Sequence, residues 1–185
     1  MTFSLALALI YSVGWIPCFV FRTESPAGAW SLLTTDERLW TILTPAIITV
    51  HLTLSCLTIS VAPAIAPWRA VTGLTLFAAG MAFWFWARVM IGPLRRRRLP
   101  DEPPPHFRRD GAFGLVRNPL YFGLLVAALA PVVTAGPPAS LVTYAGCVIA
   151  LAVRARQDEQ RLHEQVGTEY EAYCRDVSRL IPFVW

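Results

Sequence analysis

Long runs almost without charge are the feature that most limits what this chain can fold into. Residues 1–21 contain no charged side chain, residues 39–62 have His51 as their one titratable side chain apart from a cysteine, and residues 70–92 contain Arg88 as their one charge. About 20 such residues are enough for a helix to cross the hydrocarbon core of a bilayer. We therefore predict three membrane spans. Residues 1–21 are interpreted as a retained span, because a signal peptide would begin with basic residues and the first charge here is Arg22.

Two shorter apolar runs follow, residues 119–135 and 139–153. As helices they would be about 26 and 23 Å long, at about 1.5 Å per residue. The sequence "AGPP" between them predicts a tight turn, so residues 119–153 are expected to form a helical hairpin. With 55% hydrophobic residues in the whole chain, the pattern predicts an all-α polytopic membrane protein. Residues 1–185 would form a single membrane domain of five transmembrane helices, three of them within residues 1–92.

The positive charges predict how these spans are oriented. All 16 cationic side chains are arginines, and fourteen of them lie in residues 22–38, in residues 93–118 and from residue 154 onward. By the positive-inside rule these segments are cytoplasmic and the N-terminus is outside. The run "RRRR" at 95–98 follows a span directly and has no aromatic residues among it. It is therefore expected to face the lipid bilayer and not a nucleic acid.

The polar segments have two different characters. Residues 93–118 are rich in proline and are expected to be a cytoplasmic loop. In residues 154–185, apolar side chains recur every three or four positions, as on one face of a helix. This spacing predicts a cytoplasmic amphipathic C-terminal helix, followed by a tail. The apolar positions of that helix are Leu162, Val166, Tyr170, Tyr173 and Val177. The four cysteines have no metal-site spacing and no disulfide framework, so no metal is predicted.

The stretch "GAFGLVRNPLYFG", residues 111–123, leads from the polar loop into an apolar run. Asn118 and Pro119 are typical of a helix start, because asparagine can accept a bond from a first-turn amide and proline has no amide to leave unpaired. The free amides of such a start, with Arg117 beside them, also suit a bound carboxylate or phosphate. A plain helix start and a binding site both remain open at this point.

Asp158 and Glu159 are a second candidate for a site, at the cytoplasmic edge of the fifth predicted span. The alternative is a solvent-exposed acidic pair that balances the charge of nearby arginines, because charged side chains on surface helices are usually solvated. Two further groups lie at membrane depth. Arg88 is close enough to the end of its span to reach the interface, and His51 is expected to be a neutral imidazole bonded to a backbone carbonyl.

Two blocks of this sequence resemble the integral-membrane methyltransferases related to isoprenylcysteine carboxyl methyltransferase and the phospholipid methyltransferases. The first block keeps the motif's Gly111, Arg117, Pro119, Tyr121 and Gly123 at their spacing. The second, "DEQRLHEQVGTEYEAYCRDVSRLIPF", begins 41 residues after Arg117. Its matching positions are Asp158, Glu159, Leu162, Gly167, Glu169, Tyr170, Tyr173, Ile181 and Pro182. The resemblance covers residues 105–185, and the first three spans fit the family only in number and polarity.

This resemblance implies an enzyme that uses S-adenosylmethionine at the cytoplasmic membrane face. It implies that Asn118 and Tyr121 hold the carboxylate end of the cofactor and that Glu159 takes its amino group. Phe113 and the loop from His106 would line the adenosine. The full set of implied cofactor-binding residues is His106, Phe107, Gly111, Phe113, Arg117, Asn118, Pro119, Leu120, Tyr121, Asp158 and Glu159.

The chain departs from the family pattern at two of these positions. Asn118 stands where the family has histidine, and Phe113 stands where it has tyrosine. Methyl transfer from a sulfonium needs alignment more than a general base, so the asparagine does not argue against activity. No catalytic residue is assigned.

The methyl acceptor would be lipophilic, such as a prenylcysteine-like carboxylate, another lipid or a small hydrophobic molecule. Arg88 and Arg154 are the predicted substrate-binding residues, because either arginine could pair with an anionic acceptor. Two alternatives remain. One is an NADPH-dependent enzyme like the sterol reductases, whose C-terminus the tail also resembles. The other is a non-enzymatic membrane protein that binds a lipid or a partner.

Overall fold

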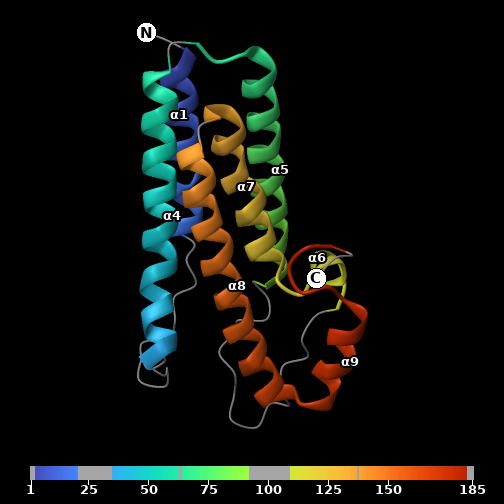
Figure 1. Cartoon of the computed structure of the whole chain (residues 1–185). Helices are drawn as coiled ribbons and strands as arrows, with labels where there is room; N and C mark the ends of the chain where they lie inside the picture. Colours follow the sequence, from blue (N-terminus) through green and yellow to red (C-terminus); the bar gives the residue numbers. More distant parts are fainter. Residues whose placement is uncertain (1–2, 21–34, 63, 92–108, 137, 183–185) are drawn as a thin grey trace. The chain divides into compact units, whose positions relative to one another are not determined.

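The computed structural model of the protein describes residues 3–20, 35–62, 64–91, 109–136 and 138–182. Every regular element within those ranges is a helix, which confirms the all-α prediction for this part of the chain (Figure 1). The helices are α1 (Phe3–Gly14), α2 (Ile16–Val20), α4 (Thr35–Val61), α5 (Pro67–Ile91), α6 (Ala112–Leu115), α7 (Pro119–Ala135), α8 (Pro138–Val166) and α9 (Thr168–Asp176). The arginine run 95–98 and most of the predicted loop 93–118 lie outside the described residues.

Two helices, α4 and α5, are long and apolar enough by length and composition to cross a membrane. They match the predicted spans 39–62 and 70–92, and α4 begins earlier, at Thr35. Asp36 and Glu37 lie in its first turn, where the helix dipole favours negative charge. The apolar stretch Phe3–Cys18, which covers α1 and part of α2, is shorter, and so is α7. The count of five spans stays a prediction.

The first predicted span is not one continuous helix. α1 ends at Gly14 and α2 begins at Ile16, so the helix is interrupted at Trp15. Pro17 has no backbone N–H to continue the helical ladder, and the amide of Cys18 instead bonds the carbonyl of Trp15 at 3.0 Å. The interruption follows from a proline inside a run whose composition alone predicts an unbroken span.

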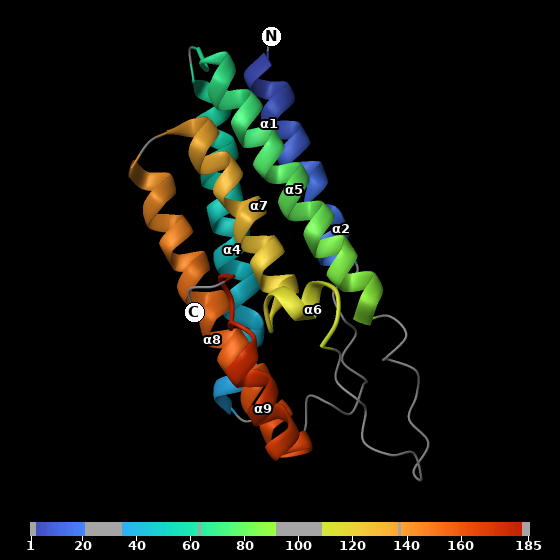
Figure 2. The same cartoon turned by 90° about the vertical axis from the view of Figure 1, so that its right-hand side faces the viewer.

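The fifth predicted span and the start of the predicted C-terminal helix lie in one continuous helix. α8 continues through residues 153 and 154 without a break, and the interruption comes at Gly167. Gly167 has φ 66°, a value that glycine reaches without steric cost. Figures 1 and 2 show the chain reversing direction there, so that α9 runs back from the end of α8. Of the five apolar positions, Leu162 and Val166 therefore belong to α8, Tyr170 and Tyr173 belong to α9, and Val177 follows the end of α9.

Residue contacts divide the chain into two compact units. Unit 1 consists of Met1–Phe77 with Ala128–Arg154, and unit 2 consists of Ala78–Ala127 with Ala155–Trp185. In unit 1, α1 packs beside α4 (Figure 1). The hydroxyl groups of Tyr11 and Thr134 share a hydrogen bond of 2.8 Å. A Cβ at Gly73 would come within 2.6 Å of that tyrosine oxygen, so glycine leaves room for the bond.

His51 lies fully buried in unit 1. Its Nε2 is 2.9 Å from the carbonyl oxygen of Ala128, and its Nδ1 is 2.8 Å from Thr143 Oγ1. Both ring nitrogens therefore have a partner, and the predicted bond to a backbone carbonyl is confirmed. The imidazole serves the packing of this unit.

In unit 2, the backbones of α5 and α7 come into close contact at two glycines. A Cβ at Gly80 would lie 2.7 Å from the carbonyl oxygen of Gly123, and a Cβ at Gly123 would lie 2.9 Å from that of Gly80. Small residues allow apolar helices to approach in this way. Phe83 and Phe122 pack edge to face beside the crossing, with ring centroids 5.1 Å apart. The last glycine of the first motif therefore has a packing role.

Candidate functional site

The first motif block folds into a short helix, an extended link and the start of α7. Gly111 precedes α6 with φ 56°, and a Cβ there would come within 2.6 Å of the methyl group of Met90. Val116 has extended backbone. α7 then begins at Pro119, and the amide of Phe122 bonds the carbonyl of Asn118 at 3.1 Å. The predicted helix start at Asn118 and Pro119 is confirmed.

The side chain of Asn118 does not cap this helix. Within the described ranges no first-turn amide of α7 donates to it; instead its Nδ2 donates to Glu159 Oε1 at 2.8 Å and to the carbonyl oxygen of Arg179 at 3.1 Å. Both partners are acceptors, which fixes the orientation of the amide group, because only its nitrogen can donate. Asn118 therefore joins the start of α7 to α8 and to the C-terminal tail.

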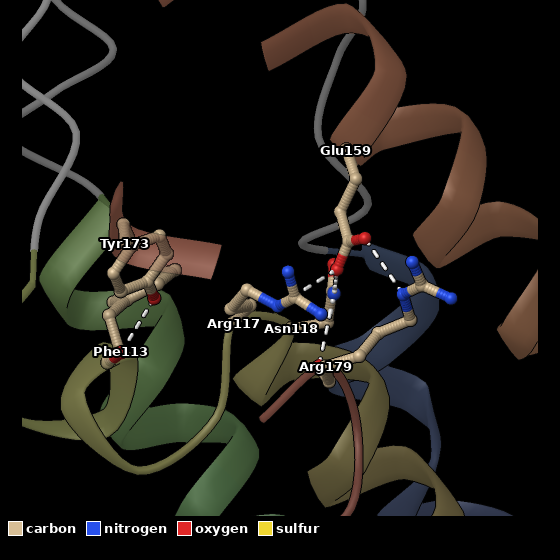
Figure 3. Close-up of polar contacts among 6 residues, drawn as sticks. All are labelled: Phe113, Arg117, Asn118, Glu159, Tyr173 and Arg179. Atoms are coloured by element: carbon tan, nitrogen blue, oxygen red, sulfur yellow. Dashed lines mark hydrogen bonds and ion pairs between the residues drawn. The ribbon is translucent and has the colours of Figure 1, made fainter. Parts of the chain in front are cut away.

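Glu159 is the centre of this cluster (Figure 3). Its side chain is 8% exposed. Oε1 lies 3.4 Å from Arg117 Nε, in addition to the bond from Asn118, and Oε2 accepts a bond of 2.8 Å from Arg179 Nε. A buried carboxylate is costly unless it is paired and hydrogen-bonded, and these three side chains meet that requirement. The alternative of a solvated acidic side chain is wrong for Glu159.

The contact between Asn118 and Glu159 differs from the arrangement that the resemblance implied. Asn118 and Glu159 were expected on two sides of a cofactor, one at its carboxylate and one at its amino group. In the structure they are bonded directly to each other. The carboxylate of Glu159 therefore already has partners within the protein, and a ligand would have to share or replace them.

The C-terminal tail forms part of the site, which the sequence did not predict. The amide of Arg117 bonds the carbonyl of Ser178 at 2.9 Å, and the amide of Asn118 bonds the carbonyl of Arg179 at 3.1 Å. Leu180 is buried beside them, with 1% of its surface exposed. The one available signal was the position of Arg179 just ahead of the Ile-Pro pair that ends the second block.

A second contact joins the two blocks one turn further along α7. The hydroxyl group of Tyr121 donates to Asp158 Oδ2. Tyr121 follows Asn118 by three residues, and Asp158 directly precedes Glu159. Both acidic residues, Asp158 and Glu159, therefore contact the first block. Pro119 is buried at the start of α7, and Leu120 is half-buried beside it.

Two tyrosines of α9 complete the described surroundings. Tyr173 donates from its hydroxyl group to the carbonyl oxygen of Phe113 at 2.6 Å (Figure 3), and the guanidinium of Arg109 lies 5.9 Å from its ring centroid. Burial raises the pKa of Tyr173, although the nearby charge of Arg117 opposes the shift. Burial also raises the pKa of Tyr170, and the negative charge of Glu159 adds to that effect. Both phenols therefore stay neutral at physiological pH.

A hollow of about 720 Å³ lies next to Glu159 in unit 2. This volume is within the range of small-molecule sites, about 300 to 1,000 Å³. Its lining is largely charged and polar, and it includes Arg117, Arg156, Glu159, His163, Tyr170 and Arg179. Cations and carboxylates both face it, so it suits a ligand with charges of both signs.

The two predicted substrate-binding arginines belong to different units. Arg154 belongs to unit 1, where its Nη1 donates to Thr41 Oγ1 at 3.1 Å. Arg88 lies half-buried near the end of α5 in unit 2. The predicted role of these two arginines toward a methyl acceptor stays a prediction. His106 and Phe107 lie outside the described residues.

Comparison with known proteins gives two methyltransferases. The chain is 32% identical over 88 residues to a methanethiol S-methyltransferase of a Pseudomonas species, an alignment that covers 47% of this chain and 32% of the relative. It is 37% identical over 84 residues to methanethiol S-methyltransferase 1 of Bradyrhizobium diazoefficiens, covering 45% of this chain and 28% of the relative. The chain thus spans about a third of the length of these relatives.

No protein-family model matches the chain. The two relatives nevertheless carry the name of a methyltransferase, as the two motif blocks led us to expect. The resemblance of this chain to the integral-membrane methyltransferases is therefore confirmed, at modest identity and over less than half of its length.

Proposed function

We propose that this protein is a membrane methyltransferase that uses S-adenosylmethionine. One observation carries the proposal: the two motif blocks that resemble the methyltransferases meet in the structure through Asn118 and Glu159, 2.8 Å apart. Similarity to two S-methyltransferases supports it independently of that geometry.

The residues around the hollow fit the amino-acid end of this cofactor. That end carries an ammonium and a carboxylate, and the hollow offers Glu159 for the first and arginines for the second. The Nε atom of Arg117 is buried and makes no hydrogen bond, although it lies 3.4 Å from Glu159 Oε1. Such an atom is open to a better-placed acceptor.

Glu159 and Arg117 would hold the two charged groups of the cofactor, with Asn118, Tyr121 and Asp158 fixing their positions. When bound, the cofactor would supply a methyl group: the acceptor atom bonds the methyl carbon, the broken carbon–sulfur bond leaves its electron pair on the cofactor's sulfur, and the acceptor's proton passes to water. The contribution of the chain is to align the two molecules and to exclude water.

We further propose that the protein crosses the membrane five times, with its N-terminus outside and its C-terminus cytoplasmic. The lengths and apolar composition of α4 and α5 support spanning helices. The fourteen arginines in residues 22–38, 93–118 and 154–185 support the orientation. The site around Glu159 would then face the cytoplasm.

For the acceptor, we propose a lipophilic molecule whose methylated atom is a thiol sulfur. The names of both relatives support a thiol over a carboxylate, since each is a methanethiol S-methyltransferase. The apolar character of the predicted spans supports entry of the acceptor from the lipid. Arg88 and Arg154 are the residues we propose to contact it.

Methyl transfer with a labelled cofactor tests this function in purified, detergent-solubilised protein. We expect transfer to alkyl thiols, and less to prenylcysteine carboxylates or phospholipid amines. Replacing Arg154 with Ala should weaken use of the acceptor and leave cofactor binding near normal; an equal loss of both would contradict the assignment of Arg154.

Calorimetric titration separates this function from the alternatives. We expect binding of S-adenosylhomocysteine to the wild-type protein, and loss of that binding in Glu159→Gln. Binding of NADPH instead would favour a reductase, and heat with neither ligand would favour a protein that binds a lipid or a partner.

A further inference from the structure

Arg69 is an isolated charge in the apolar part of the chain. Residues 1–21, 39–87 and 119–153 contain no other charged side chain. Among the described residues of unit 1, the acidic ones are Asp36 and Glu37, in the first turn of α4. Arg69 follows the other end of that helix, and its 27 residues span about 40 Å. No carboxylate of the described part of unit 1 therefore neutralises Arg69.

The backbone at the end of α7 leaves a place for the guanidinium of Arg69. α7 ends at Ala135, and Gly136 follows it with φ 76°. A Cβ at Gly136 would lie 2.7 Å from Arg69 Nη1 and closer still to Nη2. The guanidinium therefore lies against the C-terminal end of α7, where the partial negative charge of the last carbonyl groups favours a cation. Glycine suits this position both for its φ and for its missing side chain.

Trp68 adds an exposed aromatic ring beside this charge. Trp68 is 66% exposed, and Arg69 Cζ lies 5.8 Å from the centroid of its ring. Tryptophan is enriched where the hydrocarbon core of a membrane meets the lipid headgroups. The ring and the guanidinium would therefore lie at the depth of the headgroups, where the phosphates of phospholipids carry negative charge.

The proposed orientation of the spans puts the connection between α4 and α5, and with it Arg69, on the outer side. Fourteen of the 16 arginines lie in the segments proposed to be cytoplasmic. An arginine on the outer side opposes this bias, so it is not explained by the orientation of the protein. A bound anion would explain it.

We propose that Trp68 and Arg69 form a binding site for the phosphate group of a phospholipid in the outer leaflet. The guanidinium donates to the phosphate oxygens, which its planar fork of N–H groups matches. The indole ring packs on the lipid next to its headgroup. This inference rests on the membrane orientation proposed above, and it does not depend on methyl transfer.

Lipid titration of the full chain, purified in a maltoside detergent, tests the proposal. The probe is dioctanoyl phosphatidylcholine, whose headgroup has no net charge, so that the arginine-rich segments attract it little. A lipid that binds the folded protein raises its melting temperature, and the dependence on lipid concentration gives a dissociation constant. We expect Arg69→Gln to bind this lipid at least about fivefold more weakly than the wild type.

Two further ligands identify the source of the phosphate. Dioctanoylglycerol has the same acyl chains and no phosphate, whereas inorganic phosphate has no acyl chains. We expect each of them to bind the wild type and Arg69→Gln with affinities within about twofold of each other. If inorganic phosphate distinguishes the two proteins as strongly as the lipid does, the site binds a free anion and the proposal is wrong.

Two variants separate the position of the guanidinium from its charge. Arg175→Gln is the matched control, because it removes the same charge from an exposed side chain in the last turn of α9 and should keep the wild-type affinity. Gly136→Ala keeps Arg69 and places a Cβ where its guanidinium lies. This variant should weaken lipid binding by about the same factor as Arg69→Gln.

Three results with the lipid would contradict the proposal. Equal affinities of Arg69→Gln and the wild type would show that Arg69 does not bind the phosphate. An equal loss in Arg175→Gln would make the effect one of net charge. Wild-type affinity in Gly136→Ala would overturn the role given to the position of the guanidinium. The proposed methyltransferase activity is tested separately, by binding of S-adenosylhomocysteine, so failure of one proposal leaves the other standing.

Discussion

Asn118 Nδ2 lies 2.8 Å from Glu159 Oε1, so one hydrogen bond joins residues that are 41 positions apart in the sequence. The same amide nitrogen reaches the carbonyl oxygen of Arg179. Three segments of unit 2 therefore meet at one side chain: the start of α7, α8 and the tail. This side chain is an asparagine where the resembling family has a histidine, and both types can donate to a carboxylate.

Replacing Asn118 with Asp should destabilise the protein and abolish binding of S-adenosylhomocysteine. The change removes two donated hydrogen bonds and places a second carboxylate beside Glu159. We expect a loss of about 1 to 3 kcal/mol in the free energy of unfolding, measured by thermal unfolding in detergent. Asn118→His keeps a donor and should lose less. Equal melting temperatures for Asn118→Asp and the wild type would contradict the role given to this amide.

Replacing Gly123 with Ala should lower the melting temperature because the new Cβ meets backbone. It would lie 2.7 Å from the amide nitrogen of Trp84 and 2.9 Å from the carbonyl oxygen of Gly80. Overpacking of this kind costs about 1 to 3 kcal/mol. Gly146→Ala is the control, since its Cβ meets only Ile47 Cγ2, at 3.5 Å. In that variant alanine should be neutral or stabilising, because it favours helix more than glycine does.

Replacing Gly111 with Ala should cost more stability than replacing Gly167 with Ala. Both glycines have positive φ and ψ near −130°, a conformation close to one reserved for glycine. Gly167 has nothing within 4 Å of a new Cβ, whereas Gly111 faces the side chain of Met90. We expect both variants to lose about 1 to 3 kcal/mol in the free energy of unfolding, measured by thermal unfolding, because of the backbone strain. Gly111→Ala should lose more than Gly167→Ala because of the contact with Met90. Adding Met90→Ala to Gly111→Ala should recover part of this extra loss, and no recovery would place the cost elsewhere.

Periodicity and composition predicted the helices well because each apolar run must satisfy its own backbone hydrogen bonds in an apolar environment. Those patterns predict where a helix lies, but they predict poorly where a helix is interrupted. Pro17 divides the first run, while Pro45 and Pro131 lie inside α4 and α7. Whether a proline breaks a helix depends on what satisfies the freed carbonyl, which is a tertiary property.

The motif spacing predicted that the two blocks belong together, and it did not predict how their side chains meet; their role in binding a cofactor stays a prediction. Five residues that the motif spacing identified make contacts between the two blocks. Asn118 bonds Glu159, Tyr121 bonds Asp158, and Arg117 forms an ion pair with Glu159. Arg179 escaped prediction because the tail is brought to the site by backbone hydrogen bonds. Backbone groups are the same at every residue, so such bonds leave no sequence signature.

The buried phenol of Tyr173 should make the stability of the protein fall at alkaline pH. Burial raises its folded-state pKa above the ordinary value of about 10. Below that value both the folded and the unfolded chain keep the proton, and the stabilisation is complete. As pH rises past about 10 the unfolded chain releases its proton first, so the free energy of unfolding decreases until the folded-state pKa is passed.

All cationic side chains of this chain are arginines, which keep their charge in that range. The alkaline titration therefore reports tyrosines and cysteines. We expect the free energy of unfolding of Tyr173→Phe, measured in detergent between about pH 9 and 12, to decline less steeply than that of the wild type. Near neutral pH this variant should be less stable by about 1 kcal/mol, because the bond to the carbonyl oxygen of Phe113 is lost. Parallel declines for the two proteins would mean that the phenol of Tyr173 titrates alike in the folded and unfolded chains.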